Sequence, residues 1–511
     1  MTRAERPRLG RAQIEQVRRN RRGVVAVPDE SMLALPEQAV QFGTGGFLRG
    51  FIDDFLHRAN GQGLFGGRVV AIGSTGSTRD RALRAQDGLY TLVVEGIDDG
   101  RSVQECRIIA SVSRAISAVD EWDAVLALAR APTLQFVFSN TTEIGIAVDP
   151  GDRADDSPPK SFPAKLTRFL YERGREFDYD ATLAPVVVPC ELIENNGDVL
   201  RELTLGLADR WSLGARFREW LGGVHFCNTL VDRIVTGTPR GADAERVAEM
   251  LGYEDALVTT CEPYRLFAIE GDATLRDRLR WTAVDPAIIV AEDIAPYRER
   301  KVRLLNGAHT LLVPAALFMG CETVRDAVCH PALRRFVRHA MLEEIAPTVR
   351  ADGAADFAEA VLDRFQNPFI RHALADIMLQ ATTKMRVRVV PSIVGYAARY
   401  DRTPQSLAFA FAAYLLLMSD GLRREGASAA PLPPDDRHAR LETHWEGARG
   451  LPDTDDAVRV IVASVCGDRE LWATDLGAVP GFVGAVTEHF QRSRAHGVAV
   501  ALDHHLGSLV A

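Results

Sequence analysis

Hydrophobic positions recur in two rhythms along the chain, and the rhythm changes near Tyr297. Before Tyr297, short apolar runs alternate with glycine turns and with segments of helical spacing, which is the pattern of alternating strands and helices. After Tyr297 the spacing is helical almost throughout. The pattern therefore predicts an α/β N-terminal part followed by a mostly α-helical C-terminal part.

The apolar runs before Tyr297 have the length of buried strands. They cover residues 38–42, 68–72, 91–95, 103–112, 134–138 and 184–189. Segments with helical spacing lie between some of them, at residues 51–59, 118–129 and 162–171. Strands that alternate with helices in this way form an open, largely parallel sheet.

A glycine-rich turn, GTGGFLR at residues 43–49, joins the first predicted strand to the first predicted helix. Glycines permit a tight turn there and let backbone N–H groups approach a pyrophosphate. The usual G-x-G-x-x-G motif fails, because Leu48 stands at the third glycine, so the turn alone is weak evidence. Together these elements predict a basic, flexible leader over residues 1–35, a Rossmann-type NAD(P)-binding domain over 36–296, and a helical substrate and catalytic domain over 297–511.

The end of the second predicted strand should face the adenosine ribose of a dinucleotide. Sites that prefer NAD usually carry an acidic residue there, and this chain has none at the strand end itself. Ser74 could bond a ribose hydroxyl, Arg79 could accept a 2′-phosphate, and Asp80 could turn back to the ribose. The choice between NAD and NADP stays open on these residues.

One helical segment, residues 297–318, combines an apolar side with three groups that move or donate protons: Lys301, Asn306 and His309. At about 100° per residue on an α-helix, His309 lies about 80° and Asn306 about 140° from Lys301, so all three share one arc. A lysine buried there must be paired or neutral, and a neutral lysine can accept a proton from an alcohol. The same residues equally suit a solvated flank, a helix break at Asn306 and a core histidine.

Composition narrows the classes of partner. The chain has 511 residues, 47% of them hydrophobic and 25% charged, which favours a soluble protein of two domains. Its net charge of −9 argues against nucleic acid as a partner. No run of about 18 apolar residues is present, so we expect no membrane span. We expect a monomer or a small homo-oligomer that acts on a small molecule.

The seven cysteines are dispersed and form no C-x-x-C pair, which indicates reduced thiols and a cytoplasmic location. Eight arginines precede Val24 without the apolar stretch of a signal peptide, so we expect a solvated leader. His504 and His505 are adjacent but lack cysteines or carboxylates at ligand spacing. We therefore expect a solvated histidine pair and no metal site.

Several segments occur in an order that is typical of one family. They are GTGGFLR at residues 43–49, SNTTE at 139–143, CELIENNGD at 190–198, FCNTLVDRIVTG at 226–237 and KVRLLNGAH at 301–309. Together they resemble the polyol-specific long-chain dehydrogenases and reductases, the family of mannitol 2-dehydrogenase, fructuronate reductase and tagaturonate reductase. The combination is most similar to the branch that reduces tagaturonate, and it covers nearly the whole chain after the leader.

The resemblance implies metal-free hydride transfer with NAD. It makes Lys301 the general acid or base, and it makes Asn306 and a loop asparagine donors to the reacting oxygen. Asn196 is the best match for that loop asparagine, although mannitol-type members carry a further asparagine where this chain has Leu192. His309 would orient the hydroxyl or the lysine. The implied cofactor-binding residues are Gly43, Gly45, Gly46, Phe47, Arg49, Ser74, Asn140 and Thr141.

The resemblance also bears on the substrate. Lys384 matches a lysine that helps to bind substrate in the family. Mannitol-type members have an arginine eight residues before it, where this chain has Asp376, which argues against a mannitol-like substrate. Arg371 and His372 are the nearest alternatives for a substrate carboxylate, which an arginine holds with two hydrogen bonds. A surface position on a helix would suit them equally well.

The sequence thus predicts an NAD(P)-dependent oxidoreductase that interconverts a keto sugar acid and its alcohol, tagaturonate and altronate. Two alternatives within the class are a mannitol or fructose-type polyol dehydrogenase and a fructuronate reductase. A third, from another class, is a nucleotide-binding protein that kept the fold without the chemistry.

Overall fold

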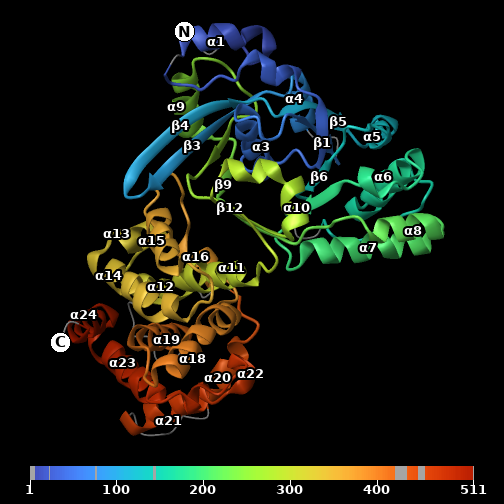
Figure 1. The fold of residues 1–511 in the computed structure, drawn as a ribbon. Helices are drawn as coiled ribbons and strands as arrows, with labels where there is room; N and C mark the ends of the chain where they lie inside the picture. The colour runs from blue at the N-terminus through green and yellow to red at the C-terminus, as the bar shows by residue number, and fades with distance from the viewer. Residues whose placement is uncertain are drawn as a thin grey trace. The chain divides into compact units, whose positions relative to one another are not determined.

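In the computed structural model, the described residues are 6–21, 23–74, 78–141, 145–419, 434–446 and 455–509. The chain divides into two compact units (Figure 1). The first comprises Met1–Gly96 and Ser102–Ile294, and the second comprises Ile97–Arg101 and Ala295–Ala511.

A five-stranded sheet is the framework of the first unit, with all its pairings parallel. Its strand order is β5-β2-β1-β6-β7. The order therefore reverses between β1 and β6, and an open parallel sheet binds its ligand beside such a point, at the carboxyl ends of the strands. The prediction of a Rossmann-type sheet is confirmed. The strands are β1 (Glu37–Phe42), β2 (Arg68–Gly73), β5 (Val112–Ser117), β6 (Phe136–Ser139) and β7 (Val186–Pro189).

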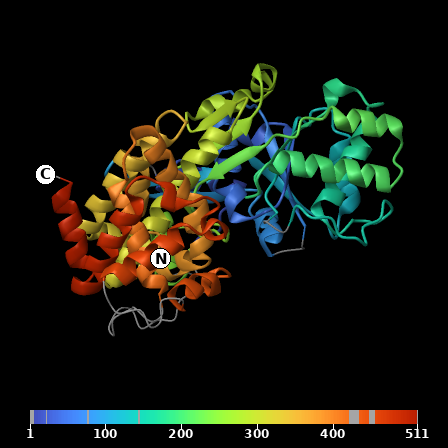
Figure 2. The ribbon, with the colours of Figure 1, turned by 90° about the horizontal axis from the view of Figure 1, so that it is seen from below.

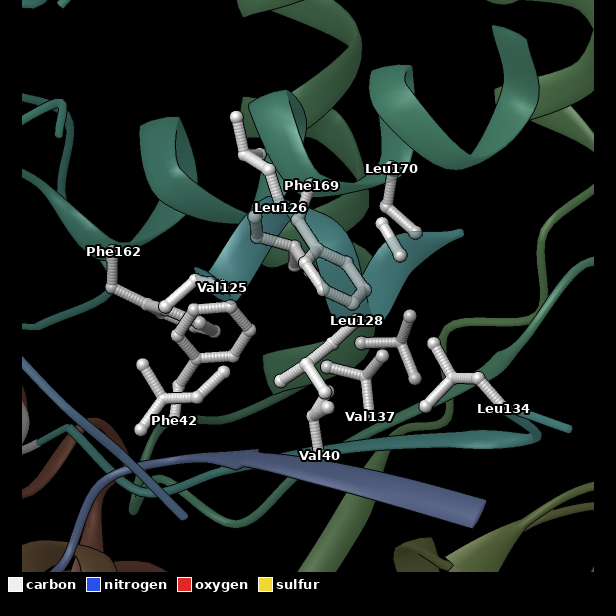
Figure 3. Close-up of a cluster of buried hydrophobic side chains, with 14 of the residues drawn as sticks. Val40, Phe42, Val125, Leu126, Leu128, Leu134, Val137, Phe162, Phe169 and Leu170 are labelled. Atoms are coloured by element: carbon white, nitrogen blue, oxygen red, sulfur yellow. The ribbon is translucent and has the colours of Figure 1, made fainter. Parts of the chain in front are cut away.

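Alternate residues of these strands supply two separate cores, because successive side chains of a strand point to opposite faces. On one face, α5 (Trp122–Ala129) and α6 (Phe162–Glu176) close over strand residues such as Val40, Phe42 and Val137 (Figure 3). On the other face, Phe136 and Phe138 pack against α3 (Ile52–Gly61) and Trp281. Both faces are therefore buried, which leaves the strand ends as the accessible edge.

Two smaller sheets complete the first unit. One has the order β4-β3-β10-β9 and the other the order β12-β11-β8. Their strands are β3 (Tyr90–Asp98), β4 (Arg101–Ile109), β8 (Thr229–Asp232), β9 (Val235–Gly237), β10 (Thr259–Cys261), β11 (Leu266–Glu270) and β12 (Ile288–Ala291). The remaining helices with eight or more residues are α4 (Thr78–Ala85), α7 (Asn196–Arg210), α8 (Ala215–Gly222) and α9 (Gly241–Leu251).

The arginine-rich N-terminal stretch is folded over its described residues, contrary to the expectation of a solvated leader. It forms α1 (Ile14–Asn20), and the side chains of Ile14 and Val17 are buried in a core with Val247 and Leu251 of α9. The arginines hid this pattern, because they flank the two apolar residues of a short amphipathic helix and dominate the composition of the stretch.

The second unit is helical (Figures 1 and 2, yellow to red). At its centre α12 (Gly307–Phe318) packs against α19 (Gln405–Met418) and several other helices. No helix among the described residues has both the length and the apolar character needed to cross a membrane. The surrounding helices are α11 (Ala295–Arg300), α13 (Val324–Cys329), α14 (Pro331–His339), α15 (Ala354–Phe365), α16 (Leu374–Met378), α17 (Ala381–Lys384), α18 (Val390–Tyr400), α20 (His438–Glu446), α21 (Asp455–Cys466), α22 (Arg469–Trp472), α23 (Phe482–His496) and α24 (Val498–Ser508).

Three π-helical segments interrupt these α-helices: η6 (Lys301–Asn306), η7 (Ala340–Ile345) and η9 (Met385–Val389). Such segments are rare and occur often at functional sites. Both η7 and η9 pack against η6, and η6 contains two of the predicted catalytic residues. The region predicted as one α-helix is therefore an α–π–α succession, because hydrophobic spacing does not report where the hydrogen bonds change from i→i+4 to i→i+5.

Candidate functional site

The glycine turn lies at the point where the strand order of the main sheet reverses. Gly43 follows β1 with φ +128° and donates its N–H to the Ile72 carbonyl, 2.9 Å away. A Cβ atom at Gly43 would lie 3.0 Å from the Asn140 carbonyl oxygen, after β6. Glycine is required here both by the positive φ and by the close approach of the two strand ends. Gly45 and Gly46 then lead into the short helix α2 (Gly46–Arg49).

Arg49 supports this turn from behind. Its guanidinium donates to the Thr44 carbonyl at 2.5 Å and to the Thr259 hydroxyl at 3.0 Å, and the residue is 2% exposed. The prediction that Arg49 contacts a cofactor is therefore corrected to a role in holding the turn. Phe47 is partly buried and stacks on Phe51, with ring centroids 4.9 Å apart.

Asp80 ties the turn to the end of β2. The Thr44 hydroxyl donates to its carboxylate at 2.8 Å, and the carboxylate fills the space beside Gly73, so that a Cβ atom there would overlap it. Of the three possibilities for this region, the structure brings Asp80 back to the strand end and leaves Arg79 exposed. Ser74, the next residue, has a hydroxyl for which no partner exists among the described residues.

Ser74 and Thr141 line the same hollow, about 380 Å³ in volume, together with Lys160, Phe162 and Lys165. The hollow therefore lies beside the ends of β2 and β6, where a dinucleotide is expected. A larger hollow of about 650 Å³ has a lining that includes residues 23–29 and 104–107, and it contains none of the predicted site residues.

Glu191 organises the loops after β6 and β7, a role that the sequence did not reveal. Its carboxylate accepts hydrogen bonds from the Ser139 hydroxyl at 3.1 Å and from the Thr141 backbone and hydroxyl, each at 3.0 Å. Burial raises the pKa of Glu191, and the hydrogen bonds from these two residues oppose that rise. Asn140 donates from its side chain to the Cys190 carbonyl at 2.7 Å. Asn140 and Thr141 are thus anchored at the strand ends. Residues 142–144 of the SNTTE motif lie outside the described residues.

The sequence predicts that Asn196 donates to the reacting oxygen, and the structure gives its side chain other partners. Its amide nitrogen donates to the carbonyls of Pro189 and Glu191 and to the Thr229 hydroxyl, at 2.9 to 3.2 Å. Its oxygen accepts the backbone N–H groups of Gly197 and Thr229, both at 2.9 Å. The side chain is 0% exposed and has no N–H group left for a reacting oxygen. Asn196 instead fastens the end of β7 to β8.

In the second unit, Lys301 and Asn306 stand at the two ends of η6. The N–H of Gly307 reaches the Val302 carbonyl, which is the i→i+5 bond of a π-helix. Residues five apart then lie about one turn apart and share a side, whereas on an α-helix they diverge by about 140°. The π-helical turn therefore brings Lys301 and Asn306 closer in direction than the predicted helix did. No partner for the Asn306 side-chain amide occurs among the described residues.

His309 lies one turn further along, between two rings. Its ring centroid is 4.3 Å from that of Phe365 and 4.9 Å from that of His372, the latter nearly edge-on. Burial, followed by the charges of His372, Arg364 and Arg388, holds the pKa of His309 well below its usual value. The imidazole is therefore neutral near pH 7 and can accept or donate one hydrogen bond at each nitrogen.

Of the substrate residues predicted from the sequence, His372 and Lys384 lie near one another: burial lowers the pKa of His372, Asp376 opposes this, and the charge of Lys384 lowers it further. His372 lies beside His309, and Lys384 donates from Nζ to the Ile377 carbonyl at 2.9 Å. Arg371 is on the surface, with its side chain 81% exposed and 3.7 Å from the equally exposed Glu322 carboxylate. Arg371 is thus a surface residue, as the alternative interpretation expected, but it lies in the non-helical segment before α16 and not on a helix.

Metal-ligating side chains do not gather within the described part of the chain: no group of three or more histidine, cysteine or acidic residues is suitably placed. The sequence predicts that His504 and His505 are both solvated, and this is wrong for His505. It is buried and shares a hydrogen bond of 3.0 Å with the Ser406 hydroxyl, whereas His504 is exposed. The seven cysteines are free thiols, most of them buried.

Comparison with known protein families assigns both parts of the chain. Residues 37–283 match the mannitol dehydrogenase Rossmann domain, and residues 293–493 match the mannitol dehydrogenase C-terminal domain. Among solved structures, mannitol 2-dehydrogenase of Pseudomonas fluorescens, in a ternary complex with NAD and D-mannitol, has a TM-score of 0.64 and 24% identity over 98% of this chain and 99% of that one. A substrate-free D-sorbitol dehydrogenase has a TM-score of 0.75 and 20% identity over 97% and 100% of the two chains.

Curated relatives are more similar in sequence. The altronate oxidoreductase of Pectobacterium atrosepticum is 41% identical over 475 residues, which cover 92% of this chain and 96% of that protein. The altronate oxidoreductase of Bacillus subtilis is 40% identical over 469 residues, which cover 92% and 95% of the two chains. On the match of both domains and on this near full-length identity, the chain belongs to the mannitol dehydrogenase family.

Proposed function

We propose that this protein is an NAD(P)-dependent oxidoreductase that interconverts a keto sugar acid and its alcohol, with tagaturonate and altronate as the pair. The observation that carries the proposal is the identity of about 41% with altronate oxidoreductase over 92% of the chain. The local geometry supports it, because the π-helical turn of η6 has a lysine and an asparagine at its two ends.

The residues at the strand ends fit a dinucleotide. Gly43, Gly45 and Gly46 would give the pyrophosphate close access to backbone N–H groups. The Ser74 hydroxyl, which has no partner among the described residues, would accept a polar partner. When bound, the nicotinamide supplies the hydride for reduction and takes it up in oxidation. The Asp80 carboxylate beside Gly73 disfavours a 2′-phosphate at the end of β2, so the proposed cofactor is NAD rather than NADP.

The chain itself would supply the proton. In reduction, the Lys301 ammonium gives a proton to the carbonyl oxygen as the carbon receives hydride, and in oxidation the neutral amine takes that proton from the hydroxyl. The Asn306 amide would donate to the oxygen, which carries most negative charge in the transition state. His309, neutral near pH 7, would orient the hydroxyl or the lysine amine through one hydrogen bond.

Asp376 argues against a mannitol-like substrate. It is exposed, and its charge acts on His372 to raise that residue's pKa against the lowering effect of burial. Mannitol-type members of the family have an arginine at this position. A substrate group that binds the arginine in those proteins would face the Asp376 carboxylate in this chain. A polyol dehydrogenase, a fructuronate reductase and a binding protein without activity are the outcomes that the test must separate.

The test is a side-by-side assay of NADH and NADPH oxidation with tagaturonate, fructuronate and fructose. Turnover with tagaturonate and NADH is expected. Fructuronate as the preferred substrate would assign a different sugar acid, and fructose as the preferred substrate would make the protein a polyol dehydrogenase. Inactivity with all three, in a protein that binds NADH, would favour the binding protein.

A further inference from the structure

The segment that follows Lys384 carries a second cation that faces the predicted catalytic helix. Arg388 belongs to η9, which packs against both η6 and α12. Its guanidinium lies 3.4 Å from the Thr310 hydroxyl, and that hydroxyl donates to the Asn306 carbonyl at 3.0 Å. The Thr310 side chain therefore links the Arg388 guanidinium to the backbone of Asn306. Thr310 also directly follows His309 in the chain.

The contact between η9 and α12 is made close by Gly307. A Cβ atom there would lie 3.2 Å from the Arg388 carbonyl oxygen, tighter than most such contacts. The backbone of Arg388 is thus held directly against the start of α12, between Asn306 and His309. Its position relative to the predicted catalytic residues is consequently set by backbone packing rather than by a flexible loop.

Arg388 has no acidic partner among the described residues. Burial lowers its pKa, and no carboxylate in the described part of the chain raises it. Its charge instead lowers the pKa of Lys384, after the effect of burial, and contributes to the low pKa of His309. The charge of a partly buried guanidinium without a counter-ion is unfavourable, and such a group is stabilised when an anion binds.

We propose that Arg388 binds the carboxylate of the sugar-acid substrate, with Lys384 as a second positive charge four residues earlier on the same face. A guanidinium matches a carboxylate with two parallel hydrogen bonds, whereas an ammonium acts as a single charge. This proposal rests on the proposed function and names the residue that separates a sugar acid from a neutral ketose. It replaces Arg371, which already lies beside Glu322 on the surface.

The test uses the full-length variants Arg388→Gln, Arg388→Lys and Arg386→Gln. Arg386 is the matched control, because it lies in the same π-helical segment and its change removes the same charge. With tagaturonate, KM should rise by about 30-fold or more in Arg388→Gln, by a smaller factor in Arg388→Lys, and by less than about threefold in Arg386→Gln. The Kd for NADH, from quenching of nicotinamide fluorescence, should stay at the wild-type value in all three.

Fructose, which lacks the carboxylate, separates recognition from general damage. The rate of wild-type protein with fructose, however small, should be retained in Arg388→Gln. An equal loss with fructose and tagaturonate, or a tagaturonate KM within threefold of wild type, overturns the proposal. If Arg388→Gln does not fold, Arg388→Lys decides: a wild-type KM for tagaturonate in that variant contradicts bidentate recognition. Wild-type protein that turns over no sugar acid overturns the proposed function and this site with it.

Discussion

Lys301 and Asn306 occupy the two ends of a single π-helical segment, five residues apart, so their directions differ less than they would on an α-helix. On a regular α-helix the same two residues would diverge by about 140°. The rare geometry thus has a direct consequence for the proposed chemistry. A proton donor and an amide that both address one oxygen need similar directions, and the π-helical turn brings them closer in direction.

The two asparagines predicted to hold the reacting oxygen should respond differently to mutation. Asn306→Ala should lower kcat by about 10²- to 10³-fold with little change in stability, because a donor to the developing charge is lost. Asn196→Ala should instead lower the free energy of unfolding by about 3 kcal/mol, since it leaves several buried partners without hydrogen bonds. Steady-state kinetics and urea unfolding measure the two effects. A stable but inactive Asn196→Ala would restore the catalytic role for Asn196.

Gly73 should be sensitive to a single methyl group. In Gly73→Ala the new Cβ would displace the Asp80 carboxylate and with it the hydrogen bond to Thr44, so the Kd for NADH should rise by about tenfold or more. Gly61→Ala is the control, because nothing lies within 4 Å of a Cβ atom at that position. Fluorescence titration with NADH measures both variants. Equal affinities would show that the Thr44–Asp80 contact does not shape the cofactor site.

Much of this fold follows from sequence patterns, and the exceptions have physical causes. The strand before Gly43 and the strand-end positions of Asn140 and Glu191 could be read from apolar runs, because the ends of parallel strands meet at one edge. The roles of Asn196 and Arg49 could not, since they depend on which partners the fold places around each side chain. A motif gives the identity of an asparagine and not the number of its N–H groups already in use.

The same limit applies to the second unit. The helical spacing around Lys301 was evident, but the π-helical bonds were not, because both helix types bury apolar residues at similar intervals. Arg388 belongs to no sequence motif. It is a candidate for binding a carboxylate because it has no acidic neighbour among the described residues, and that can be seen only in the folded structure. The burial of Ile14 and Val17 is not predicted for a different reason: the arginines around them dominate the composition of the N-terminal stretch.

Acid should destabilise the second unit through its buried histidines. Burial lowers the pKa of His505 to about 3 and that of His489 to about 4, from 6.5. The unfolded chain binds protons first as the pH falls, so their contribution to stability is complete above about pH 6.5 and is lost as the pH falls towards 4 and 3. Burial raises the pKa of Glu344 to about 7, which acts in the opposite sense, since its contribution is lost as the pH rises from 4.5 to 7.

The His505→Gln variant isolates one of these groups. It keeps a polar partner for the Ser406 hydroxyl and removes the titration, so the free energy of unfolding should depend less steeply on pH, by roughly 1 kcal/mol per pH unit below pH 6. His504→Gln is the control, because His504 is exposed. Urea unfolding at pH 7, 6 and 5 gives the slopes. The same slope in His505→Gln and wild type would mean that the pKa of His505 does not differ between the folded and unfolded chain.

The most direct test of Lys301 as the proton donor and acceptor is NADH oxidation with tagaturonate by wild-type protein and by Lys301→Ala and Lys301→Arg. Both variants should lose about 10³-fold or more in kcat, since neither alanine nor an arginine that stays charged can exchange the proton. Both should bind NADH with the wild-type Kd. Wild-type turnover of tagaturonate that disappears in both variants is the result expected here, and turnover that persists in Lys301→Ala would contradict the account at its centre.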